Sequence, residues 1–141
     1  MKFLYREGLF SGADLLSVGV ASFGHINGVH YQNQADFDPY LAKVNAGELP
    51  IFRAMAPTAE ERMIRELVLQ LKLGHVSRGY FQRKFGVDLT TRFASQIGYL
   101  RQEGFATLEG DTLRLNREAL LQIDGLLHAF FLPAHQGARY A

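Results

Sequence analysis

The residues best suited to chemistry lie in one glycine-punctuated stretch, Ser22 to Asn33. Two histidines in it, His25 and His30, can donate or accept a proton near neutral pH. The stretch also carries amide and phenol groups that can orient a polar ligand. We take this stretch as the candidate functional loop, and the candidate ligand contacts are His25, Asn27, His30, Tyr31 and Asn33.

The two loop histidines leave two interpretations open. They could position a ligand, or they could be ordinary surface or packed residues. A metal site would need a third ligand, and no nearby spacing resembles a known metal motif. The chain has no cysteine, which excludes disulfides, thiolate metal sites and thiol nucleophiles. We therefore assign no metal ligand and no catalytic residue, and we regard His75, His128 and His135 as structural.

Two other patterns give no enzymatic motif. Gly19, Gly24 and Gly28 do not form the dinucleotide fingerprint, because no suitable helix follows them at once. The glutamates Glu60, Glu61 and Glu66 share one expected helix, where capping and a solvated face explain them more simply than acid–base catalysis.

The loop needs rigid elements to position it. Leu15 to Ala21 is nearly continuous in apolar and β-branched residues, which predicts a strand buried on both faces, as in a parallel sheet. Ligands gather at the carboxyl ends of such strands. A helix is expected over 36–46, followed by an extended connector over 49–57. We place a domain boundary there, which divides the chain into residues 1–56 and 57–141.

The second part has apolar residues at helical spacing, followed by a hairpin pattern. Thr58 to Glu61 is a capping-box pattern, and Ser77 and Asn116 are further expected caps. The expected elements are helices starting near 58 and 77, a helix over 89–103, strands at 105–108 and 112–115, and a last helix from 117 that ends before Pro133. Three helices followed by a hairpin is the winged-helix order. The expected fold class is α+β, mainly α.

The composition sets limits on partners. The formal net charge is +1, so no general attraction to nucleic acid or an anionic membrane is expected. In a winged-helix protein the expected helix over 89–103 would be the recognition helix, and it would present polar groups able to contact DNA. The acidic residues Asp88 and Glu103, which would repel phosphates, flank this helix. Those polar groups are Thr91, Arg92, Ser95, Gln96, Tyr99 and Gln102. A stand-alone winged-helix module for DNA or protein binding remains the alternative function. No apolar run approaches a membrane span and no secretory signal is evident, so we expect a cytoplasmic protein.

Several short motifs occur in an order that resembles a known family. They are Gly19-Val20-Ala21-Ser22-Phe23, Tyr31-Gln32-Asn33, Tyr40, Gly47-Glu48-Leu49-Pro50, Glu61-Arg62-Met63-Ile64, Phe85-Gly86, residues 100–104 and Leu113-Arg114-Leu115-Asn116. In order and spacing, the chain resembles the C-terminal part of radical S-adenosylmethionine enzymes related to oxygen-independent coproporphyrinogen III oxidase. The loop is most similar to the haem-utilisation branch.

The resemblance implies a fragment of a tetrapyrrole oxidoreductase. Such enzymes hold a four-iron–four-sulfur cluster on three cysteines in a partial TIM-like barrel, and a C-terminal domain covers the substrate. The resemblance implies that this chain contains the last barrel strand and that domain, and that Phe23, with Ser22, contacts S-adenosylmethionine. The five loop residues would then lie near the tetrapyrrole. Without the cluster cysteines we expect no firmly bound cofactor and no activity from this chain alone. We also expect self-association through the strand expected at Leu15 to Ala21, because the chain lacks the neighbouring barrel strands that would pair with it.

Overall fold

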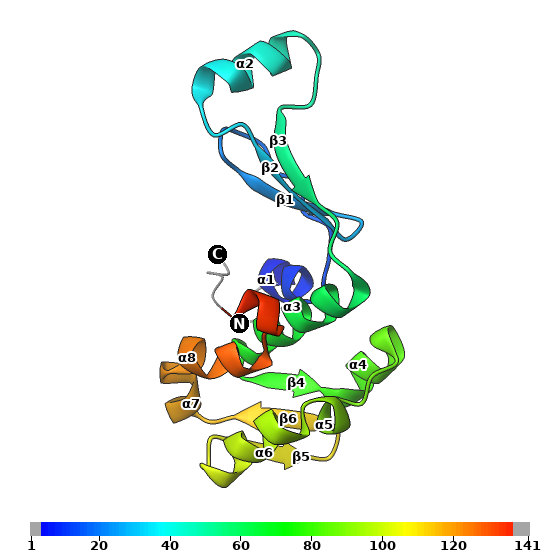
Figure 1. Ribbon diagram of the computed structural model, residues 1–141, viewed down its shortest axis with the longest axis vertical. Helices are drawn as coiled ribbons and strands as arrows, with labels where there is room; N and C mark the ends of the chain where they lie inside the picture. Colours follow the sequence, from blue (N-terminus) through cyan, green and yellow to red (C-terminus); the bar gives the residue numbers. More distant parts are fainter. Residues whose placement is uncertain (1–3, 137–141) are drawn as a thin grey trace. The chain divides into compact units, whose positions relative to one another are not determined.

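A computed structural model describes residues 4–136, and the chain divides into two compact units, Met1–Thr58 and Ala59–Ala141 (Figure 1). Each unit combines helices with one small antiparallel sheet of three strands. This confirms the mixed helix and strand content expected from the sequence.

The first unit is built around a three-stranded sheet with the order β1-β2-β3. Its elements are α1 (Leu4–Phe10), β1 (Phe23–Ile26), β2 (Val29–Asn33), α2 (Phe37–Asn45) and β3 (Ile51–Met55). The expected helix after the loop is confirmed as α2. The expected extended connector contains β3, which closes the sheet by pairing with β2.

The prediction of a buried strand from Leu15 to Ala21 is wrong. Leu16 and Val18 are 72% and 81% exposed, and this segment joins the sheet only through a single bridge at Leu15. Positive φ angles at Gly19 (104°) and Ala21 (59°) turn the chain back before β1 starts. The apolar run does not form a strand, because Gly19 and Ala21 reverse the direction of the chain.

The predicted loop is a β-hairpin. Ile26 pairs with Val29, and the two residues between them, Asn27 and Gly28, have φ angles of 48° and 80°. Two central residues with positive φ are typical of a type I′ turn, for which Asn-Gly is the strongest sequence signal. The sequence interpretation used these residues only as loop punctuation and therefore missed the hairpin.

The second unit packs helices against a sheet with the order β4-β6-β5. Its α-helices and strands are α3 (Ala59–Leu71), β4 (His75–Ser77), α4 (Arg78–Phe85), α5 (Leu89–Arg92), α6 (Ala94–Gln102), β5 (Ala106–Glu109), β6 (Thr112–Leu115), α7 (Arg117–Leu121) and α8 (Ile123–Leu127). Two short 3-10 turns follow, η1 (His128–Phe130) and η2 (Pro133–His135).

Local sequence signals located most of these elements. The side chains of Ser77 and Asn116 accept hydrogen bonds from the amides of Tyr80 and Ala119, so both expected caps are confirmed. Gly86 ends α4 with a left-handed conformation, as a C-terminal glycine should. The hairpin over 105–115 is also confirmed, as β5 and β6.

Three details differ from the expectation. The long helix over 89–103 is divided at Phe93, which has non-helical angles (φ −118°, ψ 36°). The last helix is similarly divided at Gln122 (φ −120°, ψ 20°), and Pro133 starts a 3-10 turn. Strand β4 was missed because three residues are too few to show an alternating pattern.

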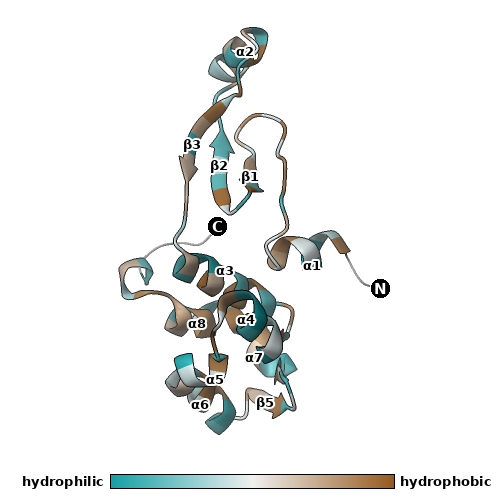
Figure 2. Ribbon diagram, turned by 90° about the vertical axis from the view of Figure 1, so that its right-hand side faces the viewer, coloured by the Kyte–Doolittle hydropathy of each residue, from teal (hydrophilic) through white to brown (hydrophobic). Residues whose placement is uncertain are grey.

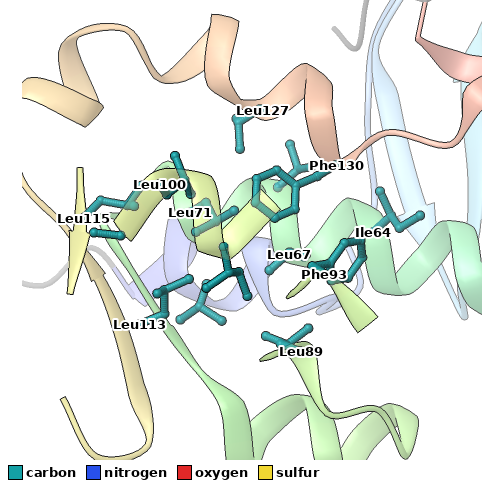
Figure 3. Packing of buried hydrophobic residues seen from close by; sticks show 14 of the residues in the cluster. Ile64, Leu67, Leu71, Leu89, Phe93, Leu100, Leu113, Leu115, Leu127 and Phe130 are labelled. Carbon is teal, nitrogen blue, oxygen red and sulfur yellow. The ribbon is translucent and has the colours of Figure 1, made fainter. Parts of the chain in front are cut away.

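One apolar core holds the second unit together. The apolar stripe of α3, including Ile64, Leu67 and Leu71, faces buried side chains from the following helices and from β6 (Figure 3). Those partners include Leu89, Phe93, Leu100, Leu113, Leu115, Leu127 and Phe130. Because Leu67 and Leu71 are almost completely buried, α3 is the central element of this unit.

A buried charge joins α3 to α4. Glu66 is only 5% exposed and accepts hydrogen bonds from the Tyr80 hydroxyl (2.6 Å) and the Lys84 ammonium (2.8 Å). Burial of the Lys84 ammonium lowers its pKa, but the hydrogen bonds and charge from Glu66 and Tyr80 outweigh this, so the pKa of Lys84 is raised. Glu66 therefore has a structural role, but the expectation that it lies on a solvated face is wrong, because its carboxylate is buried against Tyr80 and Lys84.

We predict that Asp111→Asn destabilises the second unit above pH 4, with a difference that shrinks in acid. The Asp111 carboxylate accepts hydrogen bonds from the Ser77 hydroxyl (2.6 Å) and the Gly79 amide (2.7 Å), and these lower its pKa from 3.8. The unfolded carboxyl binds its proton more readily, so this stability is present above the unfolded pKa and is lost as pH falls through the folded pKa.

Urea unfolding of both proteins between pH 2.5 and 7 measures this difference. Glu103→Gln, at the exposed C-terminal cap of α6, is the matched charge-removing control and should stay within about 0.5 kcal/mol of the parent. An Asp111→Asn effect that is the same at pH 2.5 and pH 7 would contradict the prediction.

Candidate functional site

The β1–β2 hairpin brings the predicted site residues together but divides them between two faces. His25 and His30 are paired across the two strands, and Tyr31 and Asn33 alternate with His30 along β2. Since side chains alternate across a sheet, the histidines lie on one face and Tyr31 and Asn33 lie on the other. Asn27 lies in the turn, where its backbone amide donates to the Asp14 carboxylate (2.7 Å). We name the two sides the histidine face and the tyrosine face.

On the histidine face the two imidazoles contact each other. Their Nδ1 atoms are 3.3 Å apart and their ring centroids are 4.5 Å apart. His25 is buried, whereas His30 is partly accessible and lines a cavity of about 250 Å³. The buried ring of His25 therefore orients His30 toward this cavity.

The same cavity carries a positive charge. Arg53, from β3, lines it together with Phe23, Gln32 and Met55. The Arg53 Nε donates to the Gln32 side-chain oxygen (2.8 Å), which holds the guanidinium beside the sheet. Guanidinium groups suit carboxylates, so this cavity can accept an acidic group. Sequence reasoning missed Arg53. Its position as a single charged residue between Phe52 and Ala54, in a segment expected to be extended, could have indicated a cation placed on one face of a strand.

The main chain of Phe23 faces the outer edge of the sheet. Leu15 and His25 exchange both of their backbone hydrogen bonds (2.6 and 2.9 Å), so His25 points its amide and carbonyl away from β2. Residues two apart in a strand point these groups the same way, so Phe23 does likewise. The Ser22 carbonyl, by contrast, accepts from the Asn33 amide (2.9 Å). Phe23 thus presents a main-chain donor and acceptor at this edge, beside a side chain that is 61% exposed.

A hydrogen-bonded turn holds the residues before Phe23. The Ser22 hydroxyl donates to the Gly19 carbonyl (2.7 Å). The side-chain amide of the buried Asn33 donates to the Ser22 hydroxyl and to the Gly19 carbonyl (both 3.1 Å). Ala21, between them, has a left-handed φ of 59°, which is strained for a residue with a Cβ atom. Such strain persists where the surroundings enforce it and often marks functional segments. Ser22 and Asn33 therefore position the Phe23 edge.

On the tyrosine face, the ring of Tyr31 lies over Gly24, and its oxygen accepts from the Ser17 amide (3.0 Å). A second cavity, of about 480 Å³, lies on this side, lined by residues of all three strands and of α2. The sheet is uneven in hydropathy, with most of β2 hydrophilic and most of β3 hydrophobic (Figure 2).

These residues do not form a metal cluster. Among residues 4–136, no three side chains of His, Cys, Asp or Glu gather closely enough to hold a metal ion. The sequence has no cysteine, so it offers no thiolate ligand for an iron–sulfur cluster. Within the same described range, no helix is long and apolar enough to cross a membrane.

Comparison with known proteins finds one family repeatedly. Residues 58–121 match the family described as HemN C-terminal domain. Oxygen-independent coproporphyrinogen III oxidase from Pseudomonas aeruginosa is 22% identical over 135 residues, which cover 91% of this chain and 29% of that protein. The protein of the same name from Thermostichus vulcanus is 27% identical over 123 residues, which cover 84% of this chain and 38% of that protein.

A solved structure has a similar fold. Coproporphyrinogen III oxidase (HemN) from Escherichia coli, described as a radical SAM enzyme, matches with a TM-score of 0.70 and 19% identity. The match covers 84% of this chain and 28% of that one. The chain therefore spans well under half the length of the relatives it matches.

We predict that Gly24→Ala destabilises the first unit by about 1–3 kcal/mol, the usual cost of overpacking. A Cβ atom at this position would lie 2.1 Å from the Tyr31 ring, which cannot move without losing its contact with Ser17. Thermal unfolding of the two proteins measures the loss.

Gly98→Ala is the matched control, because a Cβ atom in that helix meets nothing within 4 Å. It should be neutral or slightly stabilising. In the double variant Gly24→Ala, Tyr31→Ala the added Cβ finds space, so the two effects should not be additive. Simple additivity would show that the ring does not cause the loss.

Proposed function

We propose, from the match of residues 58–121 to the HemN C-terminal domain family, that the chain is the substrate-covering, C-terminal part of a radical S-adenosylmethionine tetrapyrrole enzyme. The match of this domain is the observation that carries the proposal. The parent reaction resembles that of oxygen-independent coproporphyrinogen III oxidase, with the haem-utilisation branch as the narrower proposal. In this proposal residues 1–56 are the last part of a TIM-like barrel.

The outward-facing main chain of Phe23 is the proposed contact for S-adenosylmethionine. An edge strand with an available amide and carbonyl can pair with the polar groups of a ligand, much as it would pair with another strand. When bound, the cofactor would supply a radical for hydrogen abstraction. Phe23 would orient it through the main chain, and Ser22 and Asn33 would fix the turn that sets the position of Phe23.

The chain alone is proposed to be inactive. Splitting the cofactor needs an electron from an iron–sulfur cluster, and such clusters are held by cysteine thiolates. This sequence provides none, so the ligands would have to come from another part of the parent enzyme.

The histidine face is the proposed tetrapyrrole side. Three features of its cavity support this: the oriented ring of His30, the cationic Arg53 and the exposed ring of Phe23. An imidazole can ligate haem iron or hydrogen-bond to a pyrrole, a guanidinium can bind a carboxylate, and an aromatic ring can stack on a planar macrocycle. Asn27, at the tip of the hairpin, could contact the rim of the ligand. Tyr31 and Asn33 are proposed to act through the backbone they support.

A winged-helix binding module is the second candidate. The element order α3-β4-α4-α5-α6-β5-β6 of the second unit fits this architecture, with α4 and α6 as the helix pair. However, three of its cations, Arg78, Lys84 and Arg92, are paired with the carboxylates of Asp88, Glu66 and Glu60. Phosphate binding would have to break these pairs, so DNA binding is the weaker proposal.

The first functional prediction concerns haem. We expect the chain to bind haem weakly, and the double variant His25→Ala, His30→Ala to bind it at least fivefold more weakly, measured by the change in absorbance on titration. His75→Ala, His128→Ala removes two exposed histidines of the second unit and is the matched control. Equal affinity in the parent and the His25/His30 variant would remove the histidine face from the proposal.

The second functional prediction separates the two candidates. We expect the chain to form dimers or larger species, because exposed apolar side chains of the first unit, such as Leu16 and Val18, favour association. We also expect little DNA retardation near physiological salt. Light scattering and a gel-shift assay measure both. A strict monomer that shifts DNA in a sequence-selective, salt-sensitive way would favour the binding module.

A further inference from the structure

The cavity on the tyrosine face has the size and lining of a small-molecule site. Its volume of about 480 Å³ lies within the range of roughly 300–1,000 Å³ that is usual for ligand pockets. Its walls are mainly aliphatic, with contributions from β1, β2, β3, α2 and residues 16–18. Leu16, Val18 and Leu49 line it and are each more than 70% exposed, so an occupant would cover apolar surface that water now contacts.

Two phenol groups on this wall have protons to donate into the cavity. The Tyr31 and Tyr40 oxygens accept from the amides of Ser17 (3.0 Å) and Gly19 (3.1 Å), which leaves each phenol proton available for another acceptor. The Ser17 hydroxyl also lacks a hydrogen-bond partner among the described residues, but protein atoms enclose it, so an occupant of the cavity does not reach it. We call Tyr31 and Tyr40 the hydroxyl cluster.

The lining contains no charged side chain. All of the residues around this cavity are apolar, hydroxylated or amide-bearing. Placing an ionised group there would cost far more than placing a neutral one, because no opposite charge is available to pair with it. The smaller cavity on the histidine face differs, since it contains Arg53.

From the apolar walls, the free hydroxyl protons and the lack of charge, we propose that this cavity binds a neutral, mostly apolar small molecule through a carbonyl or similar acceptor oxygen. The hydroxyl cluster donates to that oxygen, and the aliphatic walls cover the rest of the molecule. The proposal does not depend on the tetrapyrrole function, because it rests on the face opposite the histidines.

Nile red, a neutral apolar dye with a carbonyl oxygen, is a suitable probe for the whole chain, with binding measured by its fluorescence. We expect Tyr40→Phe and Tyr31→Phe each to weaken binding roughly fivefold, the usual effect of losing one hydrogen bond. Val29→Trp, which places an indole in the cavity, should abolish binding. Tyr99→Phe removes an exposed phenol from α6 and should change nothing.

Thermal unfolding of each variant shows whether it is folded, and the first two variants keep the shape of the cavity. Unchanged dye affinity in both Tyr40→Phe and Tyr31→Phe would overturn the role of the hydroxyl cluster. Equally tight binding of the anionic dye ANS at the same site would overturn the preference for a neutral ligand. Dye binding that disappears as the chain dimerises would assign the cavity to a second copy instead. Haem titration of Tyr40→Phe should be unchanged, so this proposal and the tetrapyrrole proposal can fail separately.

Discussion

The double hydrogen bond between Leu15 and His25 sets the geometry of the first unit. By occupying both main-chain groups of His25, it fixes which residues of β1 pair with β2 and which face outward. The amide and carbonyl of Phe23 point away from β2 for this reason. A slip of one residue would exchange the two faces of the hairpin and move the histidines to the opposite side.

The sheet so formed separates two environments of different polarity. One face has a cationic cavity beside paired imidazoles, and the other has a larger uncharged cavity beside hydroxyl groups. A thin sheet can do this because neighbouring residues of one strand point in opposite directions. Residues that are adjacent in sequence, such as His30 and Tyr31, therefore serve different surfaces.

Prediction from sequence worked where a local rule was sufficient. The caps at Ser77 and Asn116, the glycine that ends α4 and the β5–β6 hairpin each depend on a few neighbouring residues. It failed for Leu15 to Ala21, because hydrophobicity alone cannot reveal that Gly19 and Ala21 reverse the chain. The candidate site residues lie together in one hairpin, as expected for a single loop, but their division between two faces required the register. Arg53 and Tyr40 come from later segments, and only tertiary pairing brings them to the cavities.

The buried contact of Glu66 with Tyr80 and Lys84 has a consequence for the history of the protein. Losing either partner would leave the carboxylate poorly compensated inside the unit, whereas replacing the whole set with apolar residues could be almost neutral. Single changes along that route are unfavourable, although its two end points are similar in stability. Descendants of this chain should therefore keep all three residues or lose them together, so that these positions covary across lineages.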